Sequence, residues 1–539
     1  MAKRIIKLPA KNGVVYIYED FSYWDKEKGY STHERKCIGK IGEDGQYTYN
    51  EYYRTREKME NLERKAERTP SVSKTTLVGQ SLLLDKIEKQ TKVGKALVPA
   101  FGGKDATAIL ALAYYMICRG KALCRAQPWL DDRGFGDLGL CSQRISELLG
   151  RIDDDKVNAF FLRWLGMQAK GRSLLFDITS ISTYGKDNRY AERGYNRDHE
   201  NLEQVNLSLL SSCFSGLPLW YSVMPGSMSD RIVLDYVLEM LKKLGIPSFT
   251  FVGDRGFYSD SNLKNLADRG HKFTVPVPSS VSWQKKMIKE NRDELRKPEN
   301  AIDDEGTIIY GKTLYRITGY GRTWHHLYYD PARKEKVIAA FMMRLKKCRD
   351  ELDSDKPVES HQKMYDTYFT IRDTPKRGRR VSYNDEAIDG YVNNDSCYWL
   401  LISTSAKTAS EALLQYRKRN DVELCFDDMK NMLDLKRLRN HNERTVKGKV
   451  FVNFVSLIIL SQLRRTVSDI PEKEKHYWSE HDMLDKVDSY ARIHFTGKYK
   501  DVYTTPTASQ RKVFDLLGIK YQFKGKNHNA DKTNGTDSD

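Results

Sequence analysis

The sequence predicts an α/β protein whose mixed sheet is interrupted by a large insertion and preceded by a small β region and a helical region. Two observations lead to this prediction. Three strand patterns follow one another directly, and a helical pattern at 229–245 then precedes a fourth strand. A further strand pattern appears only at 396–405, after a long charged stretch. The four early strand patterns lie at 172–183, 203–214, 217–226 and 248–257. Strands and helices in this order indicate a mixed α/β core.

The chain has 539 residues, which is too long for one core, and a prior of about 150 residues per domain suggests three or four domains. Changes in composition and hydropathy pattern divide the chain into seven predicted regions. These are a small β-meander at 1–66, helices at 77–170, the first part of the core at 171–278, the insertion at 279–395, the second part of the core at 396–465, a helical region at 466–522 and a disordered tail at 523–539.

The charge balance predicts a polyanionic partner. The chain holds 90 lysines and arginines against 73 aspartates and glutamates, a formal net charge of +17. Such an excess most often indicates nucleic acid binding, although many basic proteins are merely soluble. No G-xxxx-G-K-[ST] loop occurs, so a nucleotide hydrolase is not expected.

Cysteine use and hydropathy predict the compartment. The eight cysteines form no CxxC pair and no zinc-finger spacing, so reduced thiols are expected. The N-terminal "MAKRIIKLPAK" lacks the apolar region of a signal peptide. The longest apolar runs, "TAILALAYYMI" and "VFVNFVSLIIL", fall short of the roughly 18–20 residues of a membrane span. We expect a soluble, cytoplasmic protein without membrane contact.

Two aspartates occupy apolar strand patterns. Asp177 lies within "LLFDITS", and Asp254 ends "TFVGDRGF". A carboxylate in such a setting costs desolvation free energy unless a positive group meets it, although either residue alone could simply cap a turn. Together with Glu423 from a later helix, they form an all-oxygen ligand set suited to Mg²⁺ or Mn²⁺. Two such ions about 3.5–4 Å apart would serve in-line attack on a phosphodiester.

The segment "QYRKRNDVELCFDDMK", residues 415–430, carries four polar residues in one stripe if it is a single helix. Tyr416, Arg419, Glu423 and Lys430 then fall within an arc of about 60°. Glu423 would bind metal, and Arg419 and Lys430 would hold the phosphates that flank the scissile one. Tyr416 would hydrogen-bond a phosphate or stack on a sugar or base.

A solvated helix face with i,i+4 charge pairs is the alternative interpretation of this stripe. Apolar positions on an adjoining arc place the stripe at the edge of a core instead. Asp427 shares the face and is the rival metal ligand, but Glu423 is preferred.

The spacing Y-xx-R-xxx-E-xxxxxx-K resembles the YREK signature of DDE transposases of bacterial insertion sequences, the IS-four-like superfamily. "FDITS" resembles that family's first-Asp motif, and "GDRGFYS" resembles its second. "MKNMLDLKRLRNHNERTVKGKVFVNFVSLIIL" resembles the segment after the glutamate. The resemblance covers most of the chain, and its motifs are specific jointly rather than singly.

The resemblance implies an RNase H-like catalytic domain with the first Asp on the first strand, the second Asp after the fourth and the Glu on a later helix. Relatives carry an insertion between the second Asp and the Glu. The implied activity is metal-dependent cleavage of double-stranded DNA at terminal inverted repeats, followed by strand transfer to target DNA. Water attacks first, and the freed 3′-OH then attacks DNA, so Tyr416 would be a DNA contact rather than a nucleophile. The implied partners are DNA, with the protein associated with the nucleoid when bound, and a second copy of the chain in a synaptic dimer.

Other contacts follow from the resemblance as weaker expectations. Some relatives hold a flipped base with an aromatic residue of the insertion, for which Trp283 and Trp324 are the candidates, although each could be an ordinary packed or surface tryptophan. Residues 1–170 would read the DNA ends through a helix-turn-helix-like unit.

Three arginines are further candidates. Arg437 and Arg439 would continue the phosphate track, although simple surface charges explain them nearly as well. Arg255, beside Asp254, would contact DNA or pair with a carboxylate.

Two other functions compete with transposition. An RNase H-like nuclease would hydrolyse nucleic acid without strand transfer, but the extra regions on both sides of the core favour recognition of DNA ends. A domesticated, inactive DNA-binding protein would keep only affinity for DNA, but the intact Asp177, Asp254 and Glu423 count against it.

Overall fold

The computed structural model of the chain divides into two compact units. The first comprises 1–76 and 491–504, and the second comprises 77–490 and 505–539. The structure describes residues 2–25, 28–68, 71–168, 173–185, 188–194, 196, 198, 200–228, 230–246, 248–304, 306–374, 378–439, 442–475, 478–497, 499–523 and 526–528.

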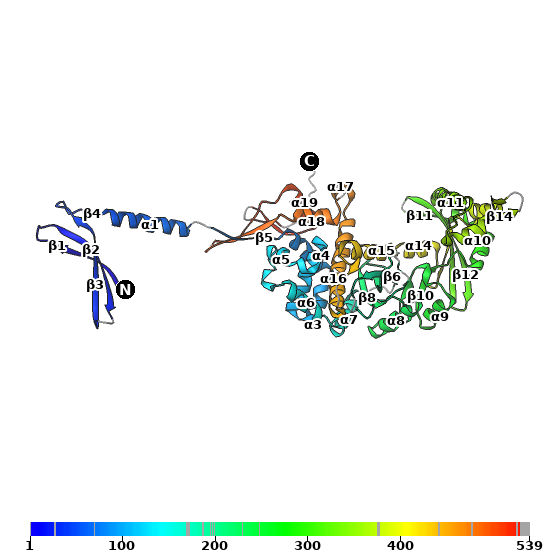
Figure 1. Ribbon diagram of the computed structural model, residues 1–539, viewed down its shortest axis with the longest axis horizontal. Helices are drawn as coiled ribbons and strands as arrows, with labels where there is room; N and C mark the ends of the chain where they lie inside the picture. The colour runs from blue at the N-terminus through cyan, green and yellow to red at the C-terminus, as the bar shows by residue number, and fades with distance from the viewer. Residues whose placement is uncertain are drawn as a thin grey trace, which may run out of the picture. The chain divides into compact units, whose positions relative to one another are not determined.

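The first unit begins with a four-stranded antiparallel meander in the order β1-β2-β3-β4 (Figure 1). Its strands are β1 (Ala2–Pro9), β2 (Val15–Asp25), β3 (Tyr30–Ile41) and β4 (Tyr47–Tyr49). The helix α1 (Glu51–Arg68) follows, so the strands end well before the predicted boundary at 66. The buried Asp20 on β2 accepts hydrogen bonds from Arg4 on β1 and Arg35 on β3, which ties the three strands together.

A second, three-stranded sheet includes residues from the C-terminal part of the chain. Its order is β19-β18-β5, with β5 (Val72–Leu77), β18 (Ala491–Phe495) and β19 (Val502–Tyr503). The prediction that 466–522 is helical is therefore wrong for β18 and β19. Both strands are short, and β18 lies beside β5, more than 400 positions earlier in the chain, so the local pattern gives little signal.

The second unit contains a helical layer built around one apolar helix, α16 (Glu443–Ser468). Helices α2, α4 and α6 pack against α16, and Figure 1 shows α4 and α6 beside it. Among the described residues, α16 is the one helix long and apolar enough to cross a membrane, and 83% of its most apolar window is buried inside the protein. Burial of this kind is typical of a core helix. The helices of the layer are α2 (Gly79–Thr91), α3 (Val93–Phe101), α4 (Gly103–Arg119), α5 (Gln127–Asp132), α6 (Ser142–Arg151) and α7 (Asp154–Gln168).

A 10-stranded mixed sheet lies beside this layer, in the order β11-β12-β13-β16-β10-β9-β6-β7-β8, with β17 paired to β6. Strands β6, β9 and β10 are parallel neighbours, whereas β7 and β8 continue antiparallel from β6. These strands are β6 (Ser173–Thr183), β7 (Gln204–Ser212), β8 (Pro218–Pro225), β9 (Thr250–Val252), β10 (Lys272–Pro276), β16 (Tyr398–Ser403) and β17 (Arg437–Leu438). The predicted mixed α/β core is present.

The insertion at 279–395 is not a separate sheet domain. Its strands β11 (Ala301–Asp304), β12 (Thr307–Thr318) and β13 (Gly321–Tyr329) extend the central sheet beyond β16. A small separate core lies around Phe341, Leu345, Cys348 and Tyr365, formed by α11 (Pro331–Asp353), α12 (Gln362–Tyr368), β14 (Phe369–Thr374) and β15 (Gly378–Tyr383). The helix α10 (Ser282–Leu295) packs instead against β12 and β13.

A hairpin lies near the C-terminus. Strands β20 (Tyr521–Phe523) and β21 (Lys526–His528) form it, so the predicted disordered tail begins too early at 523. Residues 524–525 and 529–539, which carry the rest of that prediction, lie outside the described residues.

Candidate active site

Asp177 lies within β6, and Asp254 lies two residues after the end of the neighbouring parallel strand β9. Ser173 on β6 pairs with Thr250 on β9, and Leu175 pairs with Val252. Continuing this one-to-one register by two residues brings Asp177 opposite Asp254. Side chains two positions apart point to the same face, and neighbouring strands are about 4.8 Å apart. The extended register therefore places the two carboxylates side by side where β9 ends, a position called the carboxylate edge below.

The segment that carries the other predicted site residues is not one straight helix. Helix α14 (Ala409–Arg417) ends at a turn over Lys418 and Arg419, and α15 (Asn420–Asp427) follows. A π-helical turn, η7 (Asp428–Met432), then contains Lys430. The predicted single stripe of about 60° is therefore wrong, because its geometry assumes an unbroken α-helix.

Helix α14 is fixed to the sheet by its N-terminus and one face. The Thr408 side chain and Glu411 form a capping box at its start. Ala412 and Leu413 are buried in a cluster with Tyr328 and Leu401, and half-buried Tyr416 packs against this cluster.

A hydrogen bond also joins α14 to the sheet. The Thr274 hydroxyl on β10 donates to Gln415 Oε1 over 3.0 Å.

Helix α15 brings Glu423 to the carboxylate edge. The apolar residues Val422, Cys425 and Phe426 are buried, and the helix packs against β6 and β7. Arg419, at the break between the helices, forms an ion pair from Nη1 to Asp254 Oδ1 at 2.8 Å and donates a hydrogen bond from Nη2 to Glu423. One guanidinium therefore joins two of the three predicted metal ligands. Asp427, the rival ligand, accepts a hydrogen bond from Asn431 over 2.6 Å.

Tyr416 is a neutral phenol at the edge of this site. Its ring centre lies 5.8 Å from the Arg419 guanidinium carbon. Burial raises the pKa of the Tyr416 hydroxyl, so this group stays protonated at neutral pH and can donate a hydrogen bond.

Lys430 and Arg437 each pair with a carboxylate from the segment between β6 and β7. Lys430 Nζ lies 2.8 Å from Asp198 Oδ2, and Arg437 Nη2 lies 2.6 Å from Glu200 Oε1. Hydrogen bonding to Arg437 lowers the pKa of Glu200 to about 2. Sequence reasoning did not identify either carboxylate. The charged run in "YNRDHE" was the available signal, but Tyr195, Arg197 and His199 of that run lie outside the described residues.

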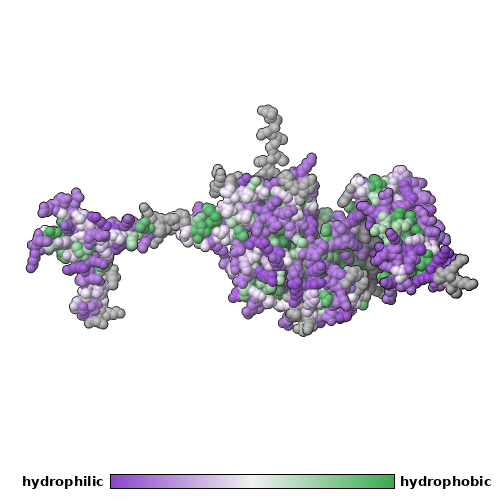
Figure 2. Space-filling view, turned by 45° about the horizontal axis from the view of Figure 1, so that its top comes forward, coloured by the Kyte–Doolittle hydropathy of each residue, from purple (hydrophilic) through white to green (hydrophobic). Residues whose placement is uncertain are grey.

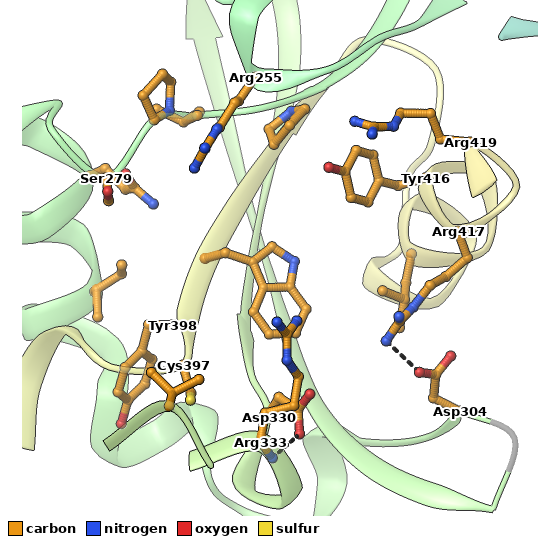
Figure 3. A pocket seen from close by; sticks show the side chains of 18 of the residues that line it. Arg255, Ser279, Asp304, Asp330, Arg333, Cys397, Tyr398, Tyr416, Arg417 and Arg419 are labelled. Carbon is orange, nitrogen blue, oxygen red and sulfur yellow. Dashed lines mark hydrogen bonds and ion pairs between the residues drawn. The ribbon is translucent and has the colours of Figure 1, made fainter. Parts of the chain in front are cut away.

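A groove of about 1220 Å³ opens beside the carboxylate edge. Figure 3 shows Arg255, Tyr416 and Arg419 at one side of it, and Arg333, Cys397 and Tyr398 at the other. Glu423 and Trp399 also line it. Arg417 pairs with Asp304 across 2.5 Å within the same groove (Figure 3). Figure 2 shows a mostly hydrophilic face that is hollowed beside the part holding α11.

The two tryptophans singled out in the sequence lie elsewhere. The Trp283 ring contacts His325 at 5.4 Å, and the Trp324 ring contacts Tyr315 at 6.1 Å. Among the described residues, neither tryptophan lines the groove, whereas Trp399 does. Trp399 stacks on Tyr328 with ring centres 5.1 Å apart, and sequence reasoning missed it because it lies within an ordinary strand pattern.

The remaining predicted arginines differ in position. Arg255 is exposed in the short 3₁₀ helix η3 (Arg255–Phe257), directly after Asp254, and its side chain lines the groove. Arg439 is exposed just beyond β17.

The donor set at the carboxylate edge fits a hard cation, because all three predicted ligands are carboxylates. Among the described residues these three carboxylates are not a group with ligand atoms within 4.8 Å of one another, and Arg419 pairs with both Asp254 and Glu423. In the part of the chain that the structure describes, the compact group of three possible ligands is Cys348, Glu351 and His361, whose ligand atoms lie within 4.8 Å of one another. His361 and Tyr365 both hydrogen-bond Glu351, at 2.8 and 2.5 Å. The Glu351 carboxylate therefore already has hydrogen-bond partners within the core of the insertion.

Comparisons with known proteins point to one family. Residues 168–459, which are 292 of the 539 residues, match the family model described as "Transposase DDE domain". No curated protein matches the chain significantly. A cryo-EM structure of the piggyBac transposase synaptic complex with hairpin DNA is similar with a TM-score of 0.32 and 11% identity, covering 80% of this chain and 70% of that chain. This structural likeness is too low to carry an argument.

Proposed function

Because the chain belongs to the transposase DDE domain family, we propose that it is a DNA transposase with the YREK signature, of the IS-four-like type. It cuts double-stranded DNA at the terminal inverted repeats of an insertion sequence and transfers the freed ends to target DNA. The observation that carries this proposal is the meeting of Asp254 and Glu423 at Arg419, on the sheet edge that also holds Asp177.

An RNase H-like core is part of the proposal. The run β8-β7-β6-β9-β10 has three antiparallel strands followed by two parallel ones, with Asp177 on the first strand in the chain and Asp254 after the fourth. This order supports the expectation from the family resemblance. The helix α15 with Glu423 comes later in the chain, as that expectation requires.

Asp177, Asp254 and Glu423 would hold two Mg²⁺ or Mn²⁺ ions. When bound, these ions would activate the attacking oxygen and stabilise charge on the leaving oxygen. The protein's own residues would position the DNA. Arg419 and Lys430 would bind phosphates, and Tyr416 would donate a hydrogen bond as a neutral phenol.

The groove would hold DNA next to the three carboxylates. Cationic and aromatic side chains together favour nucleic acid, because cations meet phosphates and aromatic rings stack on bases. We assign the stacking role to Trp399, which lines the groove, rather than to Trp283 or Trp324. Arg437, Arg439 and Arg255 would extend the phosphate contacts.

The wider assembly follows from the family resemblance. Residues 1–170 would read the DNA ends, and two copies of the chain would act together in a synaptic complex. The protein would work in the cytoplasm and bind the nucleoid through DNA.

A cleavage assay tests the proposal. The wild-type protein and Asp254→Asn would be incubated with a duplex that carries the DNA flanking the gene, in Mg²⁺, Mn²⁺ or EDTA at one moderate salt concentration. A nick at the repeat boundary that needs metal and is lost in the variant is expected. Binding without cutting in both proteins would favour an inactive DNA-binding protein, and cutting without regard to the repeat would favour a simple nuclease.

A further inference from the structure

Asp254 and Glu423 share a single cation, although they lie 169 positions apart in the chain. Arg419 Nη1 contacts Asp254 Oδ1, and Nη2 contacts Glu423 Oε1. The Arg419 side chain is only 14% exposed, whereas those of Asp254 and Glu423 are 40% and 51% exposed. The guanidinium is therefore the inner member of this group, and the two carboxylates present their outer sides to solvent.

These ion pairs occupy oxygens that a metal would also use. Asp254 Oδ1 lies 2.8 Å from Arg419 Nη1 and accepts a hydrogen bond of 2.6 Å from the Arg255 backbone N–H. A carboxylate oxygen has about two lone-pair positions, so a cation at Oδ1 would have to displace one of these two groups. A guanidinium this close would also repel a divalent ion by Coulomb's law. Arg419 and a divalent metal therefore compete for the same carboxylates.

A DNA phosphate offers Arg419 an alternative partner. Phosphate accepts two parallel hydrogen bonds from a guanidinium, as carboxylate does, and carries its charge on several oxygens. Arg419 lines the groove beside Tyr416, so a phosphate entering there can reach it (Figure 3). When the guanidinium moves to the phosphate, the oxygens of Asp254 and Glu423 become available.

We propose that Arg419 couples metal binding to DNA binding by exchanging one partner for another, an inference that rests on the proposed function. We call this exchange the latch. Without DNA, the guanidinium neutralises Asp254 and Glu423 and weakens metal binding at these residues. DNA draws the guanidinium away and strengthens metal binding. The protein then assembles a hydrolytic site mainly where a DNA phosphate is already present.

Metal affinity measured directly tests the latch. The free Mn²⁺ signal in electron paramagnetic resonance would be titrated with wild-type protein, Arg419→Ala and Arg417→Ala, at constant ionic strength and without DNA. Arg417 is the matched control, because it lies two positions away in the same groove and its loss removes the same charge, but it pairs with Asp304. We expect Arg419→Ala to bind Mn²⁺ roughly five- to tenfold more tightly than wild type. Arg417→Ala should stay within about twofold of wild type.

Adding a DNA duplex should then raise the Mn²⁺ affinity of wild type toward that of Arg419→Ala, while the variant changes little. Equal or weaker Mn²⁺ binding by Arg419→Ala, relative to Arg417→Ala, would overturn the latch. The double variant Arg419→Ala/Asp254→Asn separates the two proposals. If it binds Mn²⁺ as tightly as Arg419→Ala, Asp254 is not a ligand and the proposed metal site itself fails. If its binding is lost while Arg419→Ala matches wild type, the metal site stands and only the latch is wrong.

Discussion

Lys430 Nζ lies 2.8 Å from Asp198 Oδ2, across 232 positions of sequence. A carboxylate is the closest protein analogue of a phosphate, so this pair marks where the Lys430 ammonium would meet DNA. Lys430 is 14% exposed and Asp198 is 30% exposed, so the pair is half-buried.

Lys430→Ala should weaken DNA binding at all sequences and reduce the slope of log K against log salt by about 1, because one phosphate contact is lost. Asp198→Asn should have the opposite effect and strengthen DNA binding, because it removes the carboxylate that pairs with the Lys430 ammonium. Fluorescence anisotropy with a labelled duplex at several salt concentrations measures both. Lys447→Ala is the control, since Lys447 also pairs with an aspartate, Asp154 at 2.8 Å, but belongs to α16. An effect of Lys447→Ala as large as that of Lys430→Ala would contradict the assignment.

Tyr416→Phe should keep cleavage within about tenfold of wild type, because only one hydrogen bond is lost. The phenol is neutral at working pH, since burial raises its pKa, and it is not expected to form a covalent bond to DNA. Tyr416→Ala should lose more activity, because the ring also packs against the core of α14. Single-turnover cleavage rates compare the three proteins. Complete loss in Tyr416→Phe, together with a trapped protein–DNA adduct in wild type, would show that Tyr416 is a nucleophile.

The Glu200–Arg437 pair should make stability depend on pH in the acid range. The pKa of Glu200 is lowered from 4.5 to about 2 in the folded protein, chiefly by its hydrogen bond to Arg437. Its contribution to stability is thus present above pH 4.5 and is lost as the pH falls toward 2. Wild type should be more stable than Glu200→Gln at pH 7, and the difference should shrink between pH 5 and pH 3. Urea midpoints at the three pH values measure it. In an Arg437→Gln background, the change in stability caused by Glu200→Gln should no longer vary with pH. If it varies as much as in wild type, the hydrogen bond to Arg437 is not the cause.

Arg464→Ala should destabilise the protein by about 3–5 kcal/mol, because it leaves a buried carboxylate without its partner. Arg464 on α16 makes two hydrogen bonds of 2.7 Å to Asp428, which is 3% exposed. Thermal or urea unfolding gives the loss. The exposed neighbour Arg465→Ala is the control and should cost well under 1 kcal/mol. Arg464→Leu/Asp428→Leu should recover part of the loss, and a double variant less stable than Arg464→Ala would argue against this explanation.

Gly448→Ala should destabilise the second unit by about 1–3 kcal/mol. A Cβ at Gly448 on α16 would lie 2.3 Å from the carbonyl oxygen of Leu149 on α6, so the two helices would have to separate. Gly166→Ala in α7 is the matched helical control. Nothing lies within 4 Å of its added Cβ, and the substitution should stabilise by about 0.5–1 kcal/mol. Urea unfolding of the two variants is the test, because their free energies of unfolding should change in opposite directions. Changes of the same sign would contradict the packing argument.

Local sequence patterns were sufficient to single out Asp177 and Asp254 as candidates. Asp177 interrupts an apolar strand pattern and Asp254 ends another, and both patterns depend only on neighbours in the chain. The apolar run "VFVNFVSLIIL" lies within α16 and is buried in the core. The pairing of β6 with β9 then brought the two aspartates to one edge. This could be expected once parallel strands were assumed.

The sequence by itself determined the mixed α/β core, the three candidate carboxylates and the cationic residues near them, because hydropathy period and residue chemistry are local properties. Only the tertiary structure decided which charges meet. The turn at Lys418 and Arg419 interrupts the predicted helix and directs Arg419 to Asp254. The partners of Lys430 and Arg437 come from a segment more than 200 positions earlier. The insertion strands joined the central sheet through pairing of β13 with β16. Such pairings depend on how distant segments pack, and no local pattern contains that information.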